Sequence, residues 1–78
     1  MELIMSHENL RVVDELVRLN LIGLDGNSFS LMGAFSKAAR RQNTPKEEID
    51  KVVDMCWSAT DYNQLLRILM ANTEEVED

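Results

Sequence analysis

The sequence predicts a mainly α, small single domain of three to four short helices, with one short N-terminal β-strand. Three stretches carry apolar residues at helical spacing, and one stretch near the N-terminus alternates apolar and polar residues as a strand does. A chain of 78 residues is long enough for one core only. We expect residues 1–72 to form the helical domain and residues 73–78 to form a disordered acidic tail.

The N-terminal segment allows two interpretations. If Ser6 caps a helix, four apolar side chains share one helix face: Leu10, Val13, Leu16 and Val17. Residues 17–21 alternate instead, so a helix followed by a short strand over residues 17–22 satisfies both patterns. A lone strand leaves backbone donors and acceptors unpaired unless another strand, or a second copy of the chain, lies beside it.

The next segment predicts a helix from about Ser28 to Arg41, with Asn27 as a suitable N-cap. Its apolar face holds Phe29, Met32, Phe35 and Ala39. A second strip holds only small side chains, and we expect another helix to pack closely against it: Ser30, Gly33, Ala34 and Ala38.

Two further helices follow short breaks in the pattern. Thr44 suits the cap of the first, with Pro45 at its first position and Glu47 placed to reach back. Its apolar stripe is Ile49, Val52, Val53, Cys56 and Trp57. Ser58 or Thr60 suits the cap of the second, with Asp61 favourable in the first turn. Its stripe is Tyr62, Leu65, Leu66, Leu69 and Met70.

These stripes predict one core. We expect it to contain Phe29, Met32, Phe35, Ile49, Val52, Val53, Cys56, Trp57, Leu65, Leu66 and Leu69. A core of this size barely offsets the loss of conformational entropy in so short a chain. We therefore expect a homodimer that forms through strand pairing, with Val17, Leu19 and Leu21 as its contacts.

Charge and composition argue against several classes of function. The net charge is −6, and four acidic residues stand among the last five, so the rest of the chain carries −6 + 4 = −2. DNA-binding proteins need many cations, and here eight are spread over the chain. No apolar run suits a membrane span, and the N-terminus does not have the pattern of a secretory signal. The single Cys fits a reducing compartment, so we expect a cytoplasmic protein.

The candidate chemical groups favour no enzyme activity. Cys56 lies within an apolar stripe, far in sequence from His7, the only His, so we interpret it as a core residue. The loop from Asp25 lacks the glycine and glutamate that a calcium loop needs at its sixth and twelfth positions, where Ser30 and Ser36 stand. The carboxylates of residues 47–54 suit a solvated helix face. We therefore expect no catalytic residue, no metal and no cofactor.

Four residues are the candidates for contact with a partner. The basic cluster comprises Lys37, Arg40 and Arg41, which either grip an acidic partner or neutralise the end of their helix. Tyr62 is an aromatic residue whose hydroxyl needs a partner or water. Trp57 is also typical of interfaces, but its place in an apolar stripe favours the core.

Residues 23–42, GLDGNSFSLMGAFSKAARRQ, resemble a family of short acidic proteins from phages and bacteria, most of which have no assigned function. In that family a strand leads into Gly-x-Asp-Gly-Asn-x-Phe and then into a helix that ends in basic residues. Two later pieces also match, Glu-Glu-Ile at residues 47–49 and Ser-x-Asp-Tyr-x-x-Leu-Leu at residues 58–66, where this chain has one extra residue. The resemblance covers roughly residues 17–70 and leaves out residues 1–16.

The resemblance implies a phage origin and supports the strand over residues 17–22. By analogy with small acidic phage proteins, it implies a non-enzymatic inhibitor that binds a host anti-phage defence protein, for example a component of the BREX system. The alternative is a small regulator that binds nucleic acid through the basic cluster or mimics DNA with its carboxylates. In both cases we expect no membrane contact.

Overall fold

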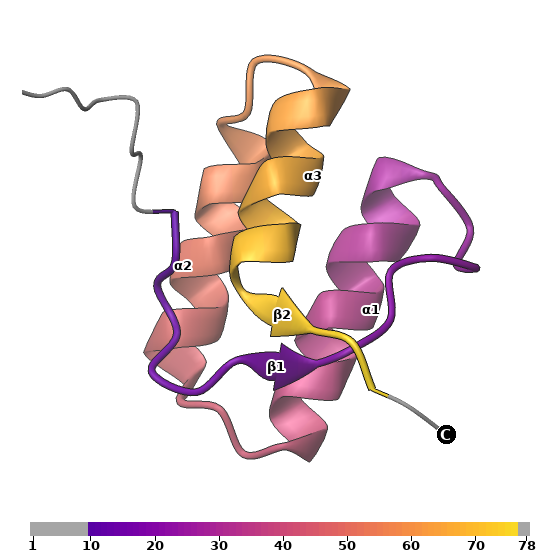
Figure 1. The fold of residues 1–78 in the computed structure, drawn as a ribbon. Coiled ribbons are helices and arrows are strands. Elements are labelled where there is room, and N and C mark those ends of the chain that lie inside the picture. The colour runs from indigo at the N-terminus through magenta and orange to yellow at the C-terminus, as the bar shows by residue number, and fades with distance from the viewer. Residues whose placement is uncertain (1–9, 77–78) are drawn as a thin grey trace, which may run out of the picture.

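Three helices pack together, and a two-stranded parallel sheet lies across them (Figure 1). The computed structural model describes residues 10–76. In chain order the elements are β1 (Val17–Arg18), α1 (Ser28–Arg41), α2 (Lys46–Trp57), α3 (Tyr62–Ala71) and β2 (Thr73–Glu74). The mainly α class and the short N-terminal strand are confirmed, although the strand is shorter than the predicted range 17–22.

The partner of β1 comes from the other end of the same chain. Val17 pairs with Thr73 and Arg18 pairs with Glu74. The Val17 N–H donates to the carbonyl of Asn72 at 3.0 Å. The predicted pairing of β1 with a second copy is therefore wrong, because β2 fills that edge. The prediction of a disordered acidic tail from residue 73 is wrong for its first two residues, which form β2.

Two side-chain amides extend this small sheet, one along the outer edge of β1 and one between the segments that follow β1 and β2. The Gln42 side chain accepts from the Arg18 N–H at 2.9 Å and donates to the Leu16 carbonyl at 2.8 Å, as a neighbouring strand would do. The Asn20 side chain makes the same pair of bonds with the peptide groups of Val76, at 2.6 and 2.9 Å. Hydrogen bonds from these side chains therefore add to the backbone hydrogen bonds that hold the two short strands together.

The side chain of Asn72 joins the N-terminal segment to α3. Its Oδ1 accepts from the N–H groups of Val12 and Val13, at 2.7 and 3.2 Å. Its Nδ2 donates to the carbonyls of Leu10 and Ile68, at 3.0 and 2.7 Å. These four bonds use the full capacity of a carboxamide, and the residue is completely buried.

The helix predicted before the strand is absent from its described part, residues 10–16. Two of the backbone donors there bond to Asn72 instead of to a helix turn. The proposed cap of that helix, Ser6, lies outside the described residues.

The caps of the helices agree only in part with the sequence pattern. Asn27 caps α1 and accepts from the Phe29 N–H at 2.8 Å, as predicted. Thr44 does not cap α2, which begins after Pro45 without a side-chain cap. Neither Ser58 nor Thr60 caps α3, because Asp61 takes that position and accepts from the Gln64 N–H at 2.8 Å. The observed N-cap is therefore the predicted residue for α1, one residue after it for α2, and one residue after Thr60 or three after Ser58 for α3.

Most of the predicted core is buried between the three helices and β1. Seven predicted core residues are buried, namely Met32, Phe35, Ile49, Val52, Cys56, Leu65 and Leu69, and two more are partly buried, namely Val53 and Leu66. The core also contains Val13, Val17, Leu31, Ala39 and Ile68, which the predicted core did not include, although Ala39 stands on the predicted apolar face of α1. The prediction is wrong for Phe29 and Trp57, which are 64% and 61% exposed. These two residues lie at the ends of their helices, beyond the layer that covers the rest of each stripe.

The small-residue strip of α1 does not serve close helix packing at two of its positions. Gly33 is exposed, and a Cβ added there would have no atom within 4 Å. Ser30 on the same strip is also exposed. No close packing is therefore seen at these two positions, whereas Ala38 of the same strip is partly buried against the core.

Replacing Asn72 by Ala is expected to lower the free energy of unfolding by about 3–5 kcal/mol, because several buried donors and acceptors lose their partner at once. Chemical denaturation of the two proteins measures this difference. The matched control is Asn63→Ala on the exposed side of the same helix, with an expected loss below about 0.5 kcal/mol. Equal, small losses for both variants would contradict the role given to Asn72.

Candidate interaction surfaces

The start of α1, the end of α2 and the start of α3 lie at one end of the helical bundle (Figure 1), and each carries an exposed aromatic residue. Phe29, Trp57 and Tyr62 are 64%, 61% and 45% exposed, and we call them the aromatic end. The fourth aromatic residue of the chain, Phe35, is fully buried. The aromatic residues thus divide between one core position and one surface.

Contacts within the aromatic end hold its side chains in place. The ring centroids of Phe29 and Trp57 are 5.4 Å apart with their planes tilted by 56°, a geometry that aromatic quadrupoles favour. The Tyr62 hydroxyl donates to the carbonyl of Gly26 in the loop before α1. A Cβ at Gly26 would lie 3.3 Å from that hydroxyl oxygen, so glycine suits this close approach.

The composition of the aromatic end is typical of a protein interface. Trp, Tyr and Phe are enriched at interfaces, where they supply much of the binding energy. Leu24, an apolar residue of the loop before α1, is also exposed, at 38%. The surface can therefore offer a partner a large apolar area around rings that are already positioned.

The basic residues predicted to bind a partner do not all face one place. Arg41 lies beside Arg18 in a small hollow, and Lys37 stands one helix turn before Arg41 on the same face of α1. Within residues 10–76, none of these three cations forms an ion pair. We call Arg18, Lys37 and Arg41 the basic patch. Arg18 had not been predicted, because only the β1–α1 packing brings it there.

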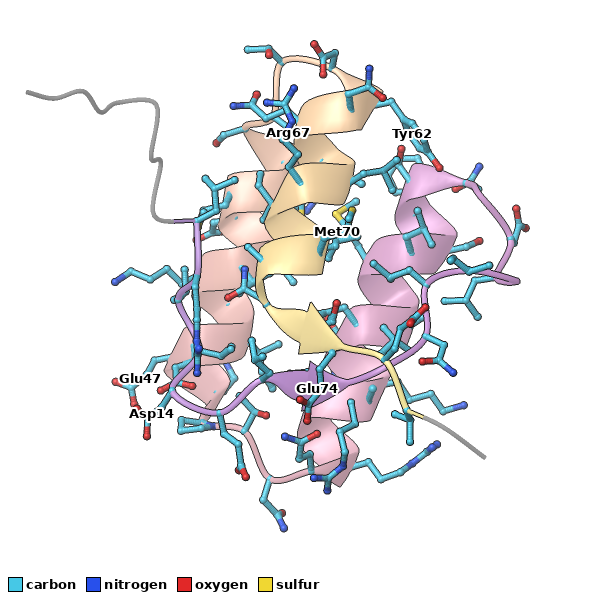
Figure 2. The ribbon with its side chains drawn as sticks, viewed as in Figure 1. Asp14, Glu47, Tyr62, Arg67, Met70 and Glu74 are labelled. Carbon is cyan, nitrogen blue, oxygen red and sulfur yellow. The ribbon has the colours of Figure 1, made fainter. Side chains whose placement is uncertain are left out.

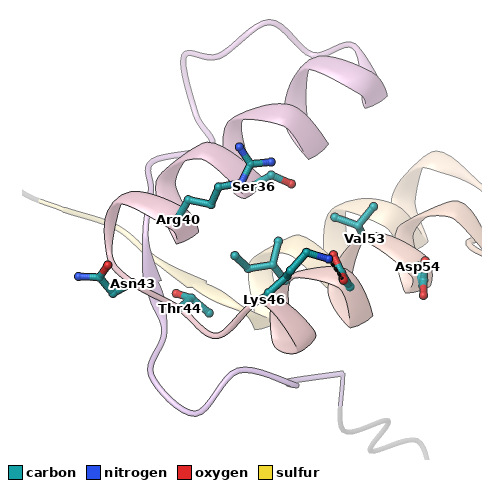
Figure 3. A pocket seen from close by; sticks show the side chains of 9 residues that line it. Ser36, Arg40, Asn43, Thr44, Lys46, Val53 and Asp54 are labelled. Carbon is teal, nitrogen blue, oxygen red and sulfur yellow. Dashed lines mark hydrogen bonds and ion pairs between the residues drawn. The ribbon is translucent and has the colours of Figure 1, made fainter.

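Arg40 instead reaches over a hollow between α1 and α2 (Figure 3). This hollow has a volume of about 780 Å³. Lys46 and Asp50 on its α2 side form an exposed ion pair at 3.0 Å, and Asp54 follows one turn later. Since cations and carboxylates both line the hollow, its charge favours neither an anion nor a cation.

Tyr62 and the basic residues belong to opposite ends of the molecule. Phe29, at the aromatic end of α1, precedes Arg40 by 40 − 29 = 11 residues. At about 1.5 Å per residue these positions are about 17 Å apart along the helix. The four residues predicted to bind a partner therefore lie in three places: Tyr62 at the aromatic end, Lys37 and Arg41 in the basic patch, and Arg40 over the hollow between α1 and α2.

The residues predicted to form a dimer interface lie in two different environments. Val17 is completely buried, so its predicted contact with a second subunit is wrong. Leu19 and Leu21 are half-buried and line an apolar groove of about 410 Å³ beside β2. The homodimer itself stays a prediction.

Cys56 is a core residue, as its position in the stripe predicted. It is 3% exposed, and desolvation by burial raises the pKa of its thiol to about 11. The nucleophilic thiolate is therefore scarce near neutral pH. Among the residues that the structure describes, no group of three or more His, Cys, Asp or Glu side chains is placed to hold a metal ion.

Comparison with known proteins adds no relative. No family model, curated protein or solved structure matches the chain. Within residues 10–76 no helix is long and apolar enough to cross a membrane. The function is therefore argued from the surfaces.

In the folded full-length chain, Cys56 is expected to react with iodoacetamide at about pH 8 at least about a hundredfold more slowly than in denaturant, because it is buried and its pKa is raised. Above about pH 9 the unfolded chain releases this proton while the folded chain keeps it, so stability falls as the pH approaches 11. Mass spectrometry of the alkylated protein measures the rate. The control is Ser58→Cys in a Cys56→Ala background, which presents an exposed thiol. Equal rates for the two folded proteins would show that Cys56 is accessible.

Proposed function

We propose that this chain is a non-enzymatic protein-binding module whose partner covers the aromatic end. The observation that carries the proposal is the exposure of Phe29, Trp57 and Tyr62 at one end of the bundle. A single exposed aromatic residue needs no explanation, but a group of them on a small domain is typical of an interface.

The energetics support contact at this end. A partner that covers about 100 Å² of each ring contributes about 2.5 kcal/mol per ring before the costs of association. Those costs are reduced when the binding groups are already held in place. The Phe29–Trp57 ring contact and the hydrogen bond from Tyr62 to Gly26 provide this arrangement in the free chain.

We infer from the resemblance to short acidic phage proteins that the module is a phage-encoded inhibitor acting in the host cytoplasm. Its partner is then a host anti-phage defence protein, with a BREX component as one candidate. Small acidic phage proteins without catalytic residues commonly act by binding a host protein. The exposed aromatic end supports this mode of action, because an inhibitor of this kind needs a surface and not an active site.

A second candidate function is nucleic-acid binding through the basic patch. The observation that favours it is the position of Arg18 beside Arg41, which adds a cation to those of α1. The net charge of −6 weighs against it, because a nucleic acid repels a chain in which acidic residues outnumber basic ones. The patch also suits an acidic area of a protein partner, so protein binding remains the better supported function.

In affinity capture from host lysate, the Trp57→Ala variant is expected to lose the captured protein, because the largest exposed ring is removed. With the purified partner, calorimetry is expected to show binding at least about 30-fold weaker, which corresponds to about 2 kcal/mol. Because Trp57 is mostly exposed, its removal leaves the fold intact, and circular dichroism checks this.

The control variant is Lys51→Ala, which removes an exposed side chain from the same helix and is expected to bind as the parent does. Unchanged partner binding by Trp57→Ala would refute the role of the aromatic end. Capture of nucleic acid that nuclease treatment removes, and that a Lys37→Glu/Arg41→Glu variant of the basic patch no longer retains, would support the second function instead.

A further inference from the structure

An apolar groove lies between α3, β2 and the chain that follows β1. It is lined by Leu19, Leu21, Ile22, Leu66, Met70, Thr73 and Glu75. Ile22 and Met70 are 83% and 63% exposed, and Figure 2 shows Met70 projecting from α3 on the side of α1. The methionine side chain adapts its shape easily, so this groove suits apolar side chains of more than one form.

The free edge of β2 belongs to this groove. In a parallel pair, alternate residues turn both peptide groups toward the partner strand. Glu74 is such a residue, since its carbonyl accepts from the Leu19 N–H at 3.0 Å. Thr73 and Glu75 therefore turn their peptide groups the other way, and both residues line the groove. The outer edge of β1 offers no equivalent position, because the Gln42 side chain occupies it.

Charge decides between the possible occupants of the groove. Glu75 is its one charged lining residue, and Glu74 lies next to it. A second copy that paired β2 with β2 around a two-fold axis would bring these carboxylates together, and like charges opposite one another are destabilising. The chain's own residues 1–9 carry two acidic residues and no Lys or Arg. A segment with basic residues therefore complements Glu74 and Glu75 better than a second copy of the chain or residues 1–9 would.

We propose that the groove binds an extended segment of a partner protein in which apolar and basic residues alternate. The segment adds to the free edge of β2 as a third strand, a recognised mode of peptide binding. Its apolar side chains enter the groove between Met70 and Leu21. Its basic side chains then lie on the opposite face of the added strand, beside Glu74, because successive side chains of a strand alternate between the two faces. This surface is separate from the aromatic end, and the proposal does not depend on the partner that binds there.

Nuclear magnetic resonance of the full-length chain tests the proposal with synthetic peptides. The probe alternates lysine and valine over six residues, and the matched probe carries glutamate in place of each lysine. The lysine peptide is expected to shift the amide signals of Thr73 and Glu75 and the methyl signal of Met70, and to bind at least about tenfold more tightly than the glutamate peptide. N-methylation of alternate peptide nitrogens on its pairing edge is expected to abolish the shifts, because strand addition needs those donors.

Two charge-reversed variants provide the control. Glu74→Lys is expected to reverse the preference between the two peptides, whereas Glu47→Lys, on the exposed surface of α2, makes the same change in net charge and leaves the preference unchanged. Trp57→Ala is expected to leave peptide binding unchanged. A negative result for the groove would therefore not refute the role of the aromatic end, and a negative result for the aromatic end would not refute the role of the groove. The proposal would be overturned if the peptides caused no shift of the groove signals, or if both peptides bound with equal affinity. It would also be overturned if the lysine peptide bound only after deletion of residues 1–9, or if the chain formed a dimer that Met70→Lys prevented, because another occupant would then fill the groove.

Discussion

The buried carboxamide of Asn72 is the interaction on which the rest of this fold depends. It bonds to backbone groups that precede it by 59 to 62 residues, and it also bonds within its own helix. A buried amide without partners carries a large desolvation cost, so these bonds require the N-terminal segment to lie against the end of α3. That position delivers β1 to β2 and seats Val17 in the core.

The surfaces of the molecule follow from this closure of the chain. Once β1 crosses α1, Arg18 arrives beside Arg41, and Leu19 and Leu21 form one wall of the groove next to β2. The aromatic end has a different origin, since it arises where three helix termini meet. A domain of this size thus presents aromatic, basic and apolar surfaces on distinct parts of its exterior, and each suits a different class of contact. Together they favour a protein that acts by binding.

The sequence predicted the helices well because their information is local. Apolar spacing and the Asn27 cap place α1 correctly to the residue. The sheet could not be predicted from local patterns, because an Asn that follows an amphipathic helix is equally consistent with a solvated helix end and with a buried side chain that bonds to a distant segment. Nothing in the local sequence distinguishes the two. Periodicity also cannot show where a stripe leaves the core, and for this reason Phe29 and Trp57 were placed inside. Arg18 joined the basic patch only through a long-range contact.

Native-state hydrogen exchange tests the central claim, that the hydrogen bonds of the Asn72 side chain make β1 part of the cooperatively folded core. The account predicts that the amides of Val17 and Leu19, which bond to Asn72 and Glu74, exchange with the same free energy of opening as the most protected amides of α3. The amide of Val12, bonded to the Asn72 side chain, belongs to the same unit. Exchange of these three amides at a much lower free energy than that of α3 would show that the strand opens independently and would contradict the account.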